Sequence, residues 1–138
     1  MKKENDELLC ARYPKIFCDR HGDMTKTLMC WGFECGDGWF EILDTACSQI
    51  QVHLDKNLDV HQVVAVQIKE KFGTLRFYYD GGDDTVQDIV DAAEQATHTT
   101  CELCGQRGTT RGGGWIQTLC DECNLDGKLQ KDFRKNSK

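Results

Sequence analysis

Two pairs of cysteines in the last third of the chain have the spacing of a metal site: Cys101 with Cys104, and Cys120 with Cys123. The pattern is C-x2-C-x15-C-x2-C, which is typical of structural zinc sites. A two-residue gap lets a tight turn aim both sulfurs at one ion, and two such turns complete a tetrahedron of thiolates. Because four sulfurs leave no open coordination position, we expect one Zn2+ that stabilises the fold and does not catalyse.

Paired cysteines also occur as disulfides of secreted proteins and as redox C-x-x-C motifs. The chain opens with charged residues and no apolar stretch follows Lys2 and Lys3, so we expect no signal peptide. No run approaches the ~18 apolar residues of a membrane span. We therefore expect a soluble cytoplasmic protein, a setting in which disulfides are rare. A thioredoxin-like motif needs a βαβ setting, which the residues around Cys101 and Cys120 do not offer.

Five further cysteines lie in the first half of the chain. Three of them, together with one histidine, could supply a second zinc ion, because three thiols and an imidazole are a known ligand set. These candidate ligands are Cys18, His21, Cys30 and Cys35. Their spacing does not match a zinc knuckle, so semi-buried thiols are the favoured interpretation. We find no familiar catalytic motif and expect no catalytic residues; a metal-dependent enzyme would need this second site.

Charge is unevenly distributed over the 138 residues, which carry a net charge of −6. Residues 1–97 hold 10 Lys and Arg against 18 Asp and Glu, a net of −8, whereas residues 98–138 hold 7 against 5, a net of +2. The length suits one modest domain with a small appendage. We therefore divide the chain into an acidic α+β domain, 1–97, and a four-cysteine module with a basic tail, 98–138.

Hydrophobic periodicity gives the elements of the first part. Apolar residues at helical spacing from Trp39 to Leu54 predict a helix with Asp37 as its N-cap. Thr85 and Asp88 resemble a capping box at the start of a further helix. Alternation of apolar and polar residues on both sides of Gly73 predicts a β-hairpin. In its first strand Val64, Val66, Ile68 and Phe72 should share one face, and in its second strand Leu75, Phe77 and Tyr79 should share one face. We expect helices at 4–13, 38–56 and 85–97, an irregular segment at 15–36, and helices packed on the hairpin in an α+β fold.

The cysteine module should contain a second hairpin, because Thr109–Arg111 and Trp115–Thr118 flank three glycines. A helix carrying Leu125, Leu129 and Phe133 would follow the second cysteine pair. This order resembles a treble-clef zinc finger, with a three-stranded zinc ribbon as the alternative. Basic residues end the chain: Lys128, Lys131, Arg134, Lys135 and Lys138. Trp115 could join Arg107 and Arg111 in a recognition surface, or it could shield the thiolates from water.

Several strings of this sequence resemble a group of small, uncharacterised phage and prophage proteins: Met29–Gly32, Cys35–Trp39, Lys69–Tyr78, Cys101–Gly105, and Trp115 with Leu119–Cys123. The resemblance covers about residues 8–125 and implies a viral gene product acting in a bacterial cytoplasm. Phage accessory proteins of this size often bind a host protein, and some are anti-CRISPRs. We therefore expect a non-enzymatic protein that binds a host protein and no membrane. A nucleic-acid-binding regulator is the alternative, and the oligomeric state stays open.

Overall fold

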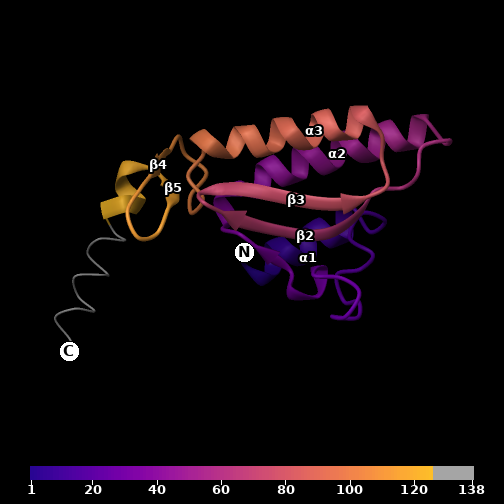
Figure 1. Cartoon of the computed structure of the whole chain (residues 1–138), viewed down its shortest axis with the longest axis horizontal. Coiled ribbons are helices and arrows are strands. Elements are labelled where there is room, and N and C mark those ends of the chain that lie inside the picture. The colour runs from indigo at the N-terminus through magenta and orange to yellow at the C-terminus, as the bar shows by residue number, and fades with distance from the viewer. Residues whose placement is uncertain (126–138) are drawn as a thin grey trace.

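The computed structural model describes residues 1–125 and has an α+β architecture of helices and small sheets (Figure 1). The helices are α1 (Lys3–Arg12), α2 (Phe40–Lys56) and α3 (Asp84–Ala96), joined by short 3-10 turns at Met29–Trp31, Asp37–Trp39 and Thr97–Thr99. The strands are β1 (Phe33–Glu34), β2 (Val64–Lys71), β3 (Thr74–Asp80), β4 (Thr109–Arg111) and β5 (Gln117–Leu119).

Strands β2 and β3 form the predicted hairpin, and β1 joins it to give a three-stranded sheet in the order β1-β2-β3. β1 runs parallel to β2, with Phe33 opposite Ile68. The segment 15–36, expected to be irregular throughout, therefore contains a strand. Two residues are too short to show a period of two, so this strand had no signature in the sequence.

A β-bulge between Ala65 and Gln67 changes which side chains of β2 face the core. The expectation that alternate residues from Val64 to Phe72 share one face is wrong: the structure buries Ala65 and Ile68, and Phe72 is 65% exposed at the turn. One extra residue in a bulge reverses the parity of everything before it. On β3, which has no bulge, Leu75, Phe77 and Tyr79 share a face as predicted, paired with Glu70, Ile68 and Ala65.

Helices α2 and α3 lie side by side along one side of the β2-β3 hairpin (Figure 1). Their apolar stripes form much of the core, with Trp39, Leu43, Cys47, Ile50, Leu54, Val86 and Val90 all buried. The N-caps differ from the prediction. Asp83, not Thr85, caps α3 by accepting a hydrogen bond from the N–H of Val86 at 3.0 Å. Asp37 instead accepts from the N–H of Lys2 at 2.7 Å, and so anchors the start of α1.

The outer edge of β3 is covered by side chains from the end of α3. The N–H of Leu75 donates to Oγ1 of Thr97 at 3.0 Å, and the N–H of Phe77 donates to Oε2 of Glu94 at 3.0 Å. Thr97 is fully buried and itself donates to the carbonyl of Glu94 at 2.6 Å. An uncovered edge would offer unpaired backbone groups to another strand, so these contacts both fix α3 and protect the sheet.

Replacing Thr97 with valine should lower the free energy of unfolding by about 1–3 kcal/mol, because the shape is kept while the buried N–H of Leu75 loses its acceptor. Urea unfolding followed by circular dichroism measures this loss. Thr99→Val is the matched control, since Thr99 is exposed on the same 3-10 turn. Equal losses in the two variants would show that the hydroxyl of Thr97 does not stabilise the sheet edge.

Candidate metal centre

The four cysteines of the double C-x2-C pattern come together at one end of the molecule. Cys101 follows the last 3-10 turn, Cys104 lies in the turn that Gly105 completes with φ +80°, and Cys120 directly follows β5. Cys123 lies in a helix that begins at residue 121. Their four Sγ atoms all lie within 4.8 Å of one another, and those of Cys104 and Cys120 are 3.6 Å apart.

This geometry matches the dimensions of a tetrahedral thiolate site. Zn–S bonds of about 2.3 Å place the sulfurs of such a site about 3.8 Å apart. Thiolates are soft ligands, which favour zinc over magnesium or calcium. The group could therefore hold a metal ion such as zinc. Within residues 1–125, no second set of three or more Cys, His, Asp or Glu side chains brings its ligand atoms together in this way.

The four sulfurs differ in their surroundings. Burial would raise the pKa of Cys101, but the backbone N–H groups of Cys120, Cys104 and Leu103 outweigh it and hold that pKa at about 7. Burial and the neighbouring sulfurs of Cys120 and Cys104 raise the pKa of Cys123. The N–H of Cys123 donates to Sγ of Cys120 at 3.4 Å. Several thiolates so close together repel one another, so the group ionises fully only when a cation compensates the charge.

The cysteine cluster is attached to the body of the protein by Glu102, the first of the two residues between Cys101 and Cys104. Glu102 is buried, its carbonyl accepts from the N–H of Gly38 at 2.7 Å, and its carboxylate accepts from the N–H of Gly36 at 2.9 Å. Burial raises the pKa of this carboxyl, and the bond from Gly36 opposes that effect. Beside it, the indole N–H of Trp39 donates to the carbonyl of Thr100 at 2.9 Å.

These contacts need glycine because two backbones approach each other closely. A Cβ at Gly38 would lie 2.1 Å from the carbonyl oxygen of Cys101, and a Cβ at Gly36 would lie 2.3 Å from that of Glu102. Sequence analysis did not assign these residues to the site. The available signal was the run Cys35–Trp39, which places two glycines, separated by one residue, just before the buried tryptophan.

A second attachment joins the small sheet to the main one. The hydroxyl of Thr118 on β5 donates to the carbonyl of Gly73 at 2.7 Å, at the turn between β2 and β3 (Figure 1). Thr118 is fully buried, and its carbonyl accepts from the N–H of Glu102 at 3.0 Å. The cysteine segment thus contacts the body at two places. The division at residue 97 stays a prediction.

The candidate second zinc site is not assembled. Sγ of Cys18 lies 3.8 Å from its neighbour Asp19, and Sγ of Cys30 lies 3.4 Å from the carbonyl of Thr27. Cys35 is buried, and burial raises its pKa to about 12. His21 is exposed and lines a surface hollow. In the described residues these four side chains do not come together. Cys18 is exposed, Cys30 is half-buried and Cys35 is buried, so the expectation of semi-buried thiols fits Cys30 alone.

The candidate recognition residues on the β4-β5 hairpin are only partly available. Arg111 donates to the carbonyl of Leu119 at 3.2 Å and to Asp121 at 2.7 Å, so its guanidinium ties the hairpin to the helix of the second cysteine pair. Arg107 is exposed, and Trp115 is 64% exposed. The predicted helix residues Leu129 and Phe133, and the basic residues from Lys128 to Lys138, lie outside the described residues.

Comparison with protein-family models, with curated proteins and with solved structures finds no match to this chain. In the described part of the chain, no helix combines the length and the apolar character needed to cross a membrane. The site must therefore be interpreted from its own geometry.

Replacing Gly38 with alanine should loosen the cysteine segment, because the new methyl group overlaps the backbone of Cys101. Overpacking of this kind costs about 1–3 kcal/mol. Acrylamide quenching would follow the change, since Trp39 is fully buried while Trp31 and Trp115 are already exposed. Gly114→Ala is the control, because nothing lies within 4 Å of a Cβ there. A Gly38→Ala protein as stable and as protected as the control would contradict the close backbone contact.

Proposed function

We propose that this chain is a zinc-stabilised, non-enzymatic binding protein. The observation that carries the proposal is the set of four cysteine sulfurs within 4.8 Å of one another, held against the body by Glu102. One zinc ion would be saturated by the four thiolates, with no position for water or substrate. The order of a knuckle, a hairpin and a helix bearing the second pair favours a treble-clef arrangement over a zinc ribbon.

The purified protein should contain one zinc per chain, and Cys104→Ser should lose it, because a neutral hydroxyl replaces a thiolate ligand. Native mass spectrometry with elemental analysis measures the stoichiometry, and a chelator should lower the unfolding temperature of the wild type. Cys18→Ser is the control, since Cys18 is exposed away from the cluster. A metal-free protein whose stability does not change in chelator would contradict a structural zinc. Two zinc ions per chain would reopen the second site.

The charge of the body is the basis for proposing a protein partner. Residues 1–97 carry a net charge of −8, which repels nucleic acid and attracts a basic surface. Proteins that handle nucleic acid present such surfaces. The resemblance to phage and prophage proteins supports a bacterial host protein as the partner. A counter-defence role of the anti-CRISPR kind would follow if that partner belonged to a nucleic-acid-guided nuclease.

Regulation through nucleic-acid binding has less support. Of the two arginines near Trp115, Arg111 is held by Asp121 and Leu119, which leaves exposed Arg107 as the clearer phosphate contact in the described residues. Within residues 1–125 this offers a small number of phosphate contacts, which alone would give weak, nonspecific binding at physiological salt.

Full-length protein should bind a basic host protein and should not bind duplex DNA or RNA at physiological salt. Affinity capture from bacterial lysate, followed by titration of the captured protein, tests the first part. Fluorescence anisotropy against salt tests the second, because several phosphate contacts would give a steep fall of log K with log salt concentration. Such a fall, together with the absence of a protein partner, would favour the nucleic-acid regulator.

A further inference from the structure

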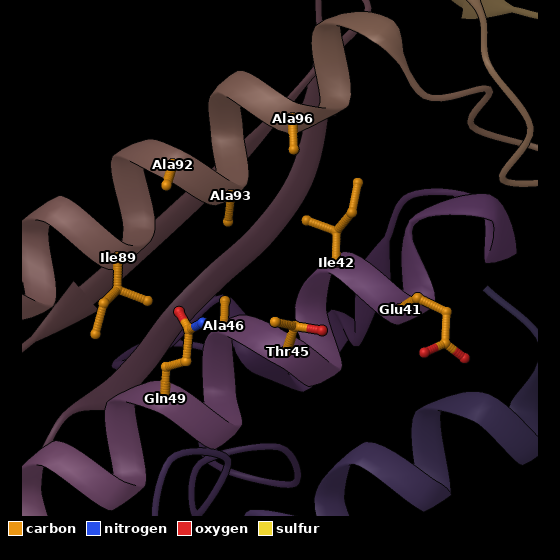
Figure 2. Close-up of a pocket in the computed structure, with 9 residues that line it drawn as sticks. All are labelled: Glu41, Ile42, Thr45, Ala46, Gln49, Ile89, Ala92, Ala93 and Ala96. Atoms are coloured by element: carbon orange, nitrogen blue, oxygen red, sulfur yellow. The ribbon is translucent and has the colours of Figure 1, made fainter.

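A groove of about 330 Å3 runs between α2 and α3 (Figure 2). Its floor contains the buried residues Ala46 and Ala93, and half-buried Ile42 and Ile89 stand toward its two ends. The remaining lining residues are Glu41, Thr45, Gln49, Ala92 and Ala96. The surface is therefore mainly apolar although it is open to solvent.

The groove exists because one helix presents small side chains to the other. Ala92, Ala93 and Ala96 lie on the side of α3 that faces α2, opposite Ala46 and Ile42 (Figure 2). From Ile89 to Ala96 the helix advances about 10 Å, which is two helical turns. That length matches the i, i+4 and i+7 anchor residues with which an amphipathic helix binds a hydrophobic groove.

The two helices that form the groove are strongly acidic. Together α2 and α3 contain seven carboxylates and one lysine, Lys56, a net charge of −6 that equals the net charge of the whole chain. Asp44 is paired with Arg12 at 3.0 Å. Glu41 lines the groove, and Asp88, one turn before Ala92 on α3, is exposed. An apolar recess flanked by carboxylates attracts a ligand that combines apolar anchors with positive charge.

We propose that this groove binds a basic amphipathic helix of the partner protein. The proposal rests on the proposed function and specifies which surface performs it. Apolar side chains of the helix enter the recess above Ala46 and Ala93, while its lysines and arginines face the carboxylates of α2 and α3. A second copy of this chain is disfavoured as the occupant, because the α2-α3 layers of the two copies, each with a net charge of −6, would repel each other.

The test uses a designed peptide of about 16 residues, long enough to form helix in isolation. It contains alanine, lysine on the outer face, and leucine at i, i+4 and i+7. Titration of the fluorescently labelled peptide with full-length protein should show saturable binding that weakens as salt is raised. A peptide with the same leucines and with glutamate for lysine should not bind. Equal binding of both peptides would overturn the charge argument.

Two variants of α3 locate the binding surface. Ala92→Lys puts a charge and a longer side chain into the groove and should weaken peptide binding at least about tenfold. Gln95→Lys makes the same change of charge on the same helix, at an exposed residue outside the lining, and should change it by about twofold or less. Both sites are exposed, so both variants should keep the circular dichroism and unfolding temperature of the wild type. Equal weakening by the two variants would place the peptide elsewhere.

The same variants separate this proposal from the proposed function. If a captured host protein binds wild type and Ala92→Lys alike, the binding function stands and the groove is not its surface. If no protein partner exists while the peptide still binds and responds to Ala92→Lys, the groove is a helix-binding surface and the proposed function fails. A wild-type dimer that Ala92→Lys dissociates would identify a second copy as the occupant and overturn the proposal.

Discussion

The close backbone contact between Gly38 and the segment Cys101–Glu102 is the constraint on which the rest of the structure depends. Two chain segments more than sixty residues apart meet with no room for a side chain between them. The meeting buries Glu102, aligns Thr100 with the indole of Trp39, and places Cys101 where the other three sulfurs can reach it. Cysteine spacing alone could bring the four sulfurs together, but this contact, together with the hydrogen bond from Thr118 to Gly73, sets where they lie on the body.

The contact also links metal binding to the core. Trp39 is fully buried, and its indole reaches the residue immediately before the first cysteine. Metal-binding free energy acts as folding free energy when the site forms only in the folded chain. A metal held by these sulfurs would therefore stabilise residues 36–39, the start of α2 and the turn at Gly73, in addition to its own loop. In this arrangement a bound metal would order one end of the acidic body.

Negative charge is concentrated on one layer of that body, the one formed by α2 and α3. The face of the main sheet that carries Lys69 has charges of both signs, because Lys69 is paired with Glu34 of β1 and with Arg76 of β3. The α2-α3 layer on the other side is acidic and contains the apolar groove. Apolar surface and concentrated charge coincide there, which is why we propose that a basic partner would bind this layer.

The sequence by itself determined the parts of this protein that depend on neighbouring residues. The cysteine pairs predicted the four sulfurs that meet, the 3.6-residue stripe predicted α2, and alternation around Gly73 predicted the hairpin. Only the tertiary structure decided β1, the bulge at Ala65 and the role of Gly36 and Gly38. Each of these features depends on a partner distant in the chain or on a local irregularity that hydrophobic periodicity does not indicate. The spacing of residues in the sequence indicates which side chains can form a site together, whereas contacts with the backbone of a remote segment decide where that site lies on the protein.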